Sequence, residues 1–241
     1  VPLTSGEIAE DVAQYFATSE QTPTVCGLGV LVNPDLTVNV AGGFLIEVLP
    51  FASDACIDTF EKNLKTLPPV TTMMTQGMTT DQIALRLLDG LVDIYLPDFK
   101  YMDPALAARY SQAPDYPDRA KEALAEMVRQ TGEAVFDDAG MMKRGVIVRH
   151  LALPGQLSDS MSVLAYLHET YGEQIFLSIM NQYTPMPGIE KTFPELGRKL
   201  SADEYDTLVD YAVLLGVENG FIQEGDTAEE SFIPPFDLEG V

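Results

Sequence analysis

The chain has 241 residues and a net charge of −23, because 37 acidic residues outnumber 14 basic ones. A protein that binds duplex nucleic acid needs a cationic face, so nucleic acid is excluded as an expected partner. The longest apolar stretches have the length of a strand, far below the roughly 20 residues that span a bilayer. A membrane is therefore excluded as an expected partner as well.

The cysteines and the first residue bear on the expected compartment. Position 1 is valine and no signal-peptide pattern follows it, so we interpret the sequence as a fragment or a processed chain without a secretion signal. The two cysteines, Cys26 and Cys56, form neither a disulfide framework nor a metal-binding quartet. We interpret both as small buried hydrophobes, since free cysteine is among the most buried residue types. A cytoplasmic location is expected.

The first part of the chain predicts a helix, a β-hairpin and further helices. Ser5 is predicted to cap the first helix, with acidic residues in the turns where the helix dipole favours anions. Two segments rich in β-branched residues flank Asn33-Pro34-Asp35, which predicts a hairpin. Gly42-Gly43 predicts a bulge or a close backbone approach in the second strand. The predicted elements are helices over residues 5–18, 53–66 and 79–89, the last capped by Thr79 or Thr80, and strands over 24–32 and 37–49.

After Gly90 strands and helices alternate, which is typical of βα units. Polar residues gather where the predicted strands end: Asp98 and Lys100 after the first, Arg149 and His150 at the second, and residues 181–183 at the third. In barrel-type α/β folds the site lies at the C-terminal ends of parallel strands, so these clusters predict a site, with rim hydrogen bonding alone as the alternative. The predicted strands cover residues 92–96, 146–151, 174–181 and 220–223; the predicted helices lie around 105–108 and over 117–130, 159–171 (capped by Ser158) and 202–215 (capped by Ser201), and an irregular tail follows at 233–236.

Four blocks in the first ninety residues match one family in the right order: Ser5–Asp11, Ser19–Pro23, Gly29–Asp35 and Ala41–Phe44. On these blocks residues 1–90 resemble the thirty-three-kilodalton, redox-regulated heat-shock chaperonins. The resemblance implies a partial α+β segment of an ATP-independent holdase of the bacterial cytosol, with unfolded client proteins as partners. It also implies a zinc switch of four cysteines in Cys-x-Cys and Cys-x-x-Cys pairs. The chain has no such pairs and therefore no zinc ligands.

Residues 91–241 resemble radical S-adenosylmethionine proteins of the pyruvate formate-lyase activating enzyme group. The blocks that carry this resemblance are Asp93–Tyr101, Lys143–Leu151, Leu153–Gly155, Met180–Pro185, Gly220–Gly225 and Ser231–Phe236. It implies the C-terminal βα units of a partial (β/α) barrel, a [4Fe–4S] cluster, S-adenosylmethionine, and a glycyl radical enzyme as partner. It places Asp98, Lys100 and Arg149 at the S-adenosylmethionine, where the two cations suit its carboxylate and Asp98 its ammonium. His150 is either a further contact or a core histidine.

Each part lacks the metal ligands of the family that it resembles. The [4Fe–4S] cluster needs an upstream Cys-x-x-x-Cys-x-x-Cys loop, and no cysteine follows Cys56, so we assign no catalytic residue. Leu88-Asp89-Gly90 joins the two parts without a linker. Three interpretations stay open: a fragment of a radical enzyme behind foreign sequence, a truncated holdase with a passenger, or two genes joined artificially, which we favour. The join predicts exposed strand edges, an unpaired edge strand at 92–96, and a poorly soluble or molten chain.

Overall fold

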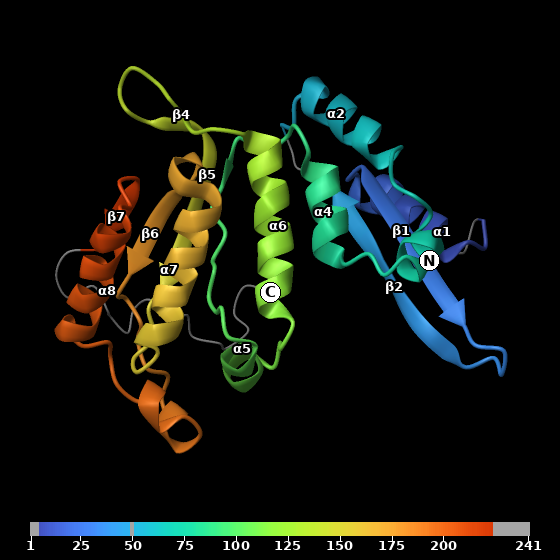
Figure 1. The fold of residues 1–241 in the computed structure, drawn as a ribbon. Coiled ribbons are helices and arrows are strands. Elements are labelled where there is room, and N and C mark those ends of the chain that lie inside the picture. Colours follow the sequence, from blue (N-terminus) through green and yellow to red (C-terminus); the bar gives the residue numbers. More distant parts are fainter. Residues whose placement is uncertain (1–4, 49–50, 224–241) are drawn as a thin grey trace. The chain divides into compact units, whose positions relative to one another are not determined.

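The computed structural model describes residues 5–48 and 51–223 of the chain (Figure 1). The chain divides into two compact units, Val1–Leu91 and Val92–Val241, which we call the N-terminal unit and the C-terminal unit. No helix in the described ranges is both long enough and apolar enough to span a membrane.

A long antiparallel hairpin forms the centre of the N-terminal unit. Strand β1 (Thr24–Val32) pairs with β2 (Val38–Glu47), so the predicted hairpin is confirmed. The register shifts between Leu31 and Val32, where the bulge lies, and not at the diglycine. Gly43 instead confirms the predicted close backbone approach, because a Cβ at this position would collide with the Gly27 carbonyl oxygen of the facing strand.

Four α-helices accompany the hairpin in the described part of the N-terminal unit. They are α1 (Ile8–Tyr15), which continues as a π-helical turn (Phe16–Glu20), α2 (Asp54–Leu64), α3 (Val70–Thr75) and α4 (Thr80–Leu88). Of the two predicted caps of α4, Thr79 is the one that caps it, in a capping box with Gln82. Ser5 does not cap α1, which begins after Glu7. Instead the Asp11 carboxylate accepts from the backbone N–H groups of Ser5 and Gly6, at 2.8 and 3.1 Å.

The C-terminal unit is built on a mostly parallel sheet. Its strands are β3 (Ile94–Tyr95), β4 (Val135–Phe136), β5 (Met142–Leu151), β6 (Phe176–Met180) and β7 (Gly220–Ile222). The order is β3-β5-β6-β7, all parallel, and β4 pairs antiparallel with β5. The helices between strands are α5 (Pro104–Ser111), α6 (Tyr116–Thr131), α7 (Leu157–Tyr171) and α8 (Ala202–Leu215), with 3₁₀ turns at Gly172–Gln174, Ile189–Lys191 and Pro194–Leu196.

Several predicted boundaries in this unit differ from the observed ones. β3 is shorter than predicted, β5 begins four residues earlier, and β4 was not predicted. Ser201 caps α8 in a capping box with Glu204, as predicted, whereas α7 begins after Gln156 and Ser158 lies inside it. The strand at 92–96 is an edge among the described residues, since β3 pairs with β5 alone. The predicted irregular tail at 233–236 lies outside the described residues.

The two faces of the parallel sheet differ in burial. Alternate residues of β5 and β6 (Val146, Val148 and Ile179) are at most 2% exposed, and they share their face with α6, α7 and α8, since connections between sequential parallel strands are right-handed. We call this the covered face. On the opposite face Ile147 and Phe176 are only half-buried and Phe221 is 50% exposed. We call this the open face; parallel sheets are normally covered on both.

Candidate functional site

One face of the hairpin exposes apolar side chains. The register places Leu28 opposite Gly43, Val30 opposite Ala41 and Val32 opposite Val38, so these side chains share one face. The large apolar side chains on this face, Leu45 included, have exposed fractions between 44% and 62%. We call this surface the open hairpin face; it consists of Leu28, Val30, Val32, Val38 and Leu45. A contiguous exposed apolar surface of this kind marks a site of interaction or aggregation.

The other face of the hairpin borders a groove. Seven consecutive residues of β2, Val40–Ile46, form one wall of a cavity of about 650 Å³. The other wall comes from α3, the turn after it and α4, and includes Met73, Met74, Met78, Ile83 and Leu87. We call this cavity the methionine groove. Val70 of α3 also lines the groove, and it packs directly over Gly29 of β1.

The two thiols lie apart in this unit. Cys26 is half-buried on β1, and burial raises the pKa of its thiol, whereas Cys56 is exposed on α2 rather than buried as expected. Among residues 5–48 and 51–223, no three His, Cys, Asp or Glu side chains are placed to hold a metal ion. Neither the four-thiolate zinc site nor the three-thiolate cluster loop fits these residues.

In the C-terminal unit Asp98, Lys100 and Arg149 lie together where β3 and β5 end. Asp98 and Arg149 form a parallel backbone bridge, with Arg149 N donating to Pro97 O and Phe99 N to Arg149 O, each at 2.8 Å. Asp98 Oδ1 lies 2.8 Å from Arg149 Nη2, and Lys100 Nζ donates to Asp98 Oδ2 at 3.1 Å. One carboxylate therefore stands between two cations, at side chains that are still 33–46% exposed.

Two polar atoms of this cluster are buried without a hydrogen-bond partner. They are Asp98 Oδ1 and Arg149 Nε. Asp98 Oδ1 is close to Arg149 Nη2, but the two lack the alignment of a hydrogen bond. Most buried polar atoms in proteins are satisfied, so a pair of unsatisfied atoms in one ion pair indicates a place where a polar ligand can bind.

His150 lies on the covered face, opposite to Arg149. Neighbouring strand residues point to opposite faces, and His150 is 2% exposed. Its Nδ1 lies 2.8 Å from the Phe99 carbonyl oxygen, which accepts only, so Nδ1 carries the hydrogen. Burial lowers the pKa of the imidazole, with a smaller contribution from the charge of Lys100. His150 is therefore a neutral histidine of the covered face, with Nε2 unpartnered.

A tyrosine that sequence reasoning missed holds the Asp98–Lys100 segment in place. The Tyr116 hydroxyl donates to Asp98 O and accepts from Lys100 N, both at 2.9 Å. Burial raises the pKa of Tyr116 to about 12, so the hydroxyl remains a donor at neutral pH. Tyr116 begins α6, well away from any strand end in the sequence, and no local pattern marks it.

The third polar cluster, residues 181–183, makes contacts within the unit. Asn181 N donates to Gln223 Oε1 at 2.8 Å, Gln223 Nε2 donates to Gln182 Oε1 at 3.0 Å, and Tyr183 donates to Leu196 O at 2.9 Å. These bonds tie the end of β6 to β7 and to the 3₁₀ turn. Rim hydrogen bonding alone therefore describes this cluster, whereas Asp98 and Arg149 keep unsatisfied atoms.

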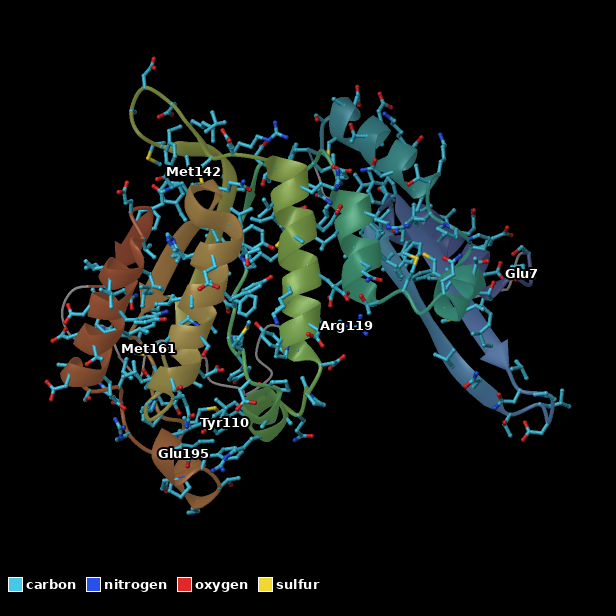
Figure 2. All side chains as sticks on the ribbon, viewed as in Figure 1. Glu7, Tyr110, Arg119, Met142, Met161 and Glu195 are labelled. Carbon is cyan, nitrogen blue, oxygen red and sulfur yellow. The ribbon has the colours of Figure 1, made fainter. Side chains whose placement is uncertain are left out.

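Glu195 connects the segment after β6 to α5 (Figure 2). Figure 2 labels Glu195 and Tyr110 close together. Glu195 Oε1 accepts from Arg109 Nη2 and from the Tyr110 hydroxyl, each at 2.7 Å. The Arg109 guanidinium also lies 5.6 Å from the ring centres of Tyr110 and Phe193. The hydrogen bond from Tyr110, with the charge of Arg109, lowers the pKa of Glu195. No buried side-chain atom of these residues lacks a hydrogen-bond partner, so we interpret the cluster as a structural contact between the two segments.

Comparison with known proteins identifies the family of the first part. The model of the Hsp33 protein family matches residues 1–142. The 33 kDa chaperonin of Clostridium beijerinckii is 36% identical over 143 residues, 57% of this chain and 44% of that protein. The 33 kDa chaperonin of Listeria innocua is 52% identical over 89 residues, 37% of this chain and 30% of that protein. A crystal structure of the 33 kDa chaperonin of Thermotoga maritima is 41% identical and covers 36% of this chain and 30% of that one, with a TM-score of 0.33.

These matches confirm the chaperonin resemblance and extend it. The chain spans less than half the length of the two chaperonins from Clostridium beijerinckii and Listeria innocua. The family match continues past Gly90 to residue 142, into β3, α5 and α6, although β3 pairs with β5 in the sheet of the C-terminal unit. It does not reach residues 143–241, and the resemblance to radical S-adenosylmethionine proteins stays a prediction. Because the family match covers more than half of the chain, the chain belongs to the Hsp33 protein family.

Proposed function

We propose that the N-terminal unit is a holdase that binds unfolded client proteins on the open hairpin face, in the cytoplasm and without ATP. The observation that carries this proposal is the exposed fraction of about half for each of Leu28, Val30, Val32 and Leu45, on one side of a hairpin whose other side faces α3. Unfolded proteins expose apolar side chains, and burial of such surface contributes about 25 cal/mol per Å². Membership in the Hsp33 family supports the proposal.

We propose further that this binding has no zinc switch. Zinc in structural sites is held by four closely spaced ligands, and the chain has two cysteines. Cys26 and Cys56 lie on different elements, and no metal-ligand group occurs among the described side chains. Client binding should therefore be insensitive to zinc chelators and to mild oxidants.

Light scattering of a thermally unfolding client tests the holdase. The chain should suppress client aggregation, and Val30→Lys with Val38→Lys should remove more than half of the effect by placing two charges on the open hairpin face. Gln14→Lys with Gln76→Lys adds the same charge at exposed positions elsewhere in the unit and should leave suppression unchanged. Equal suppression by both double variants, or none by the parent chain, would contradict the proposal.

A second candidate function belongs to the C-terminal unit. We propose that Asp98, Lys100 and Arg149 bind S-adenosylmethionine at the end of a partial barrel. The supporting observation is the pair of unsatisfied buried atoms, Asp98 Oδ1 and Arg149 Nε, beside the Lys100 ammonium. Guanidinium and ammonium groups suit the carboxylate of the ligand, and Asp98 suits its ammonium. His150 supports Phe99 from the covered face rather than touching this ligand.

The [4Fe–4S] cluster does not fit this chain. No cysteine lies in residues 92–241, and the cluster requires thiolates. S-adenosylmethionine supplies a sulfonium that a reduced cluster would cleave, so its binding here leads to no radical step. A glycyl radical enzyme is then at most a docking partner in this proposal.

Isothermal titration with S-adenosylmethionine tests the second candidate. Arg149→Ala should weaken binding about tenfold or more, because a hydrogen bond to a charged group contributes about 1.5–3 kcal/mol. Arg119→Ala removes an arginine that is paired on the exposed side of α6 and should leave affinity unchanged. An S-adenosylmethionine affinity that Arg149→Ala leaves unchanged would refute the assignment. The absence of any binding heat with the parent chain would refute it as well.

We also propose that the boundary between residues 90 and 91 separates segments of different origin. The division into compact units at Leu91 and Val92 supports it, while the extent of the family match to residue 142 weighs against it. Independent long sequencing reads across codons 80–100 decide between a genuine fusion and an artificial join.

A further inference from the structure

The outer edge of β2 is unpaired among the described residues. β2 hydrogen-bonds with β1 alone, over Val38–Glu47. All but two of its residues, Phe44 and Ile46, are exposed. An edge strand of this length presents a row of N–H and C=O groups that an extended chain can pair with.

The methionine groove lies along this same strand. Val40–Ile46 line it continuously, so the groove borders β2 over seven consecutive residues. Its volume of about 650 Å³ falls within the roughly 300–1,000 Å³ typical of ligand pockets. A strand added at the edge of β2 would place every second side chain on the groove side, at the same spacing as Val40, Phe44 and Ile46.

The lining suits apolar side chains of varied shape. Met74 and Met78 are half-buried, and methionine side chains adapt to different partners. Gly42 has no side chain here, and its nearest neighbour on that side is the terminal methyl of Met74, 3.2 Å from an ideal Cβ position. At the middle of β2 the groove is therefore bordered by a residue without a side chain and by the flexible side chain of Met74.

The charges define the partner further. Asp81 is the one charged residue among the described residues of the lining. Residues 1–90 carry 11 acidic and 3 basic side chains. We propose that the edge of β2 and the methionine groove bind an extended apolar segment flanked by lysine or arginine, which adds to the hairpin as a third strand. This proposal rests on the holdase function only for the source of the segment, an unfolded client.

A synthetic peptide tests strand addition directly. The probe is a nine-residue peptide of alternating valine and threonine with two lysines at each end, followed by fluorescence anisotropy with the full chain. Two further versions carry N-methyl groups on alternate residues, one set in each parity. Strand addition requires the N–H groups of one edge only, so one version should lose at least tenfold in affinity and the other should bind nearly as the parent peptide. Equal binding of both versions would overturn the proposal.

Protein variants locate the site. Met74→Glu should abolish peptide binding, whereas Gln14→Glu, which introduces the same charge at an exposed position of α1 outside both surfaces, should leave it unchanged. Hydrogen exchange of the unaltered chain gives a reading independent of any folding defect: bound peptide should protect the amides of β2 and not those of α2. If bound peptide does not protect the backbone amides of β2 from exchange, the proposal is refuted.

The holdase and this site fail in different ways. If Val30→Lys with Val38→Lys loses aggregation suppression but keeps peptide binding, both proposals stand at separate surfaces. If the chain suppresses aggregation yet the peptide never binds, strand addition is refuted and the holdase remains. If the peptide binds and suppression is absent, only the holdase is refuted.

Discussion

Leu164→Ala is expected to destabilise the C-terminal unit alone. Leu164 lies on α7 and is 0% exposed, so its truncation leaves a cavity in a close-packed core. Substitutions of this type lower the free energy of unfolding by about 2–5 kcal/mol. For a unit of this size each kcal/mol lowers the melting temperature by roughly 2–4 °C, which predicts a decrease of about 4–20 °C.

Tyrosine fluorescence separates the two units in this experiment. The chain has no tryptophan and ten tyrosines, of which Tyr15 alone precedes residue 92. Fluorescence therefore follows the C-terminal unit, while far-ultraviolet circular dichroism follows helices of both. We expect Leu164→Ala to lower the midpoint of the fluorescence transition. The part of the dichroism transition that comes from the N-terminal unit should keep its midpoint.

Leu214→Ala is the matched control. Leu214 is 83% exposed on α8, so the same chemical change should cost less than about 0.5 kcal/mol. Two results would refute the reasoning: equal costs for the two substitutions, or a Leu164→Ala shift that moves both signals together as one cooperative transition. A broad melt without cooperativity in either signal would instead agree with the molten chain predicted from the join.

Three further predictions concern local structure. Thr79→Ala removes the capping box of α4 and should cost the N-terminal unit about 1 kcal/mol in urea unfolding, while Thr79→Ser should retain most of it. The bidentate pair with Arg198 lowers the pKa of Glu204 below its ordinary value of 4.5, so the unfolded state binds its proton first as the pH falls. Stability from this group is present above about pH 4.5 and is lost toward lower pH; Glu204→Gln should flatten the acid limb of the stability curve, and an unchanged limb would contradict this. Burial keeps His150 neutral in the folded state, so nitrogen NMR should show the Nδ1–H tautomer persisting below pH 6.5; a protonated ring at that pH would contradict the covered-face placement.

Local signals accounted for the elements whose causes lie within a few residues. The β-branched run from Thr24 to Val32 predicted β1. Ser201 and one of the pair Thr79 or Thr80 were predicted as helix caps, because a cap depends only on residues within one turn. The failures have the opposite character. β4 is two residues long and exists only through its pairing with β5, and Ser158 lies inside α7 because the helix starts earlier, after Gln156.

The candidate sites show the same division. Sequence pattern and family resemblance brought Asp98, Lys100 and Arg149 to one place, since parallel strands end at a common edge. Strand alternation placed His150 on the face opposite to Arg149, but only the packing of helices decided which face is covered and leaves the imidazole neutral. The hairpin and the loss of metal ligands follow from the sequence alone. The methionine groove and the open hairpin face were decided by tertiary structure, because α3 covers Gly29 of β1 and leaves the edge of β2 unpaired among the described residues.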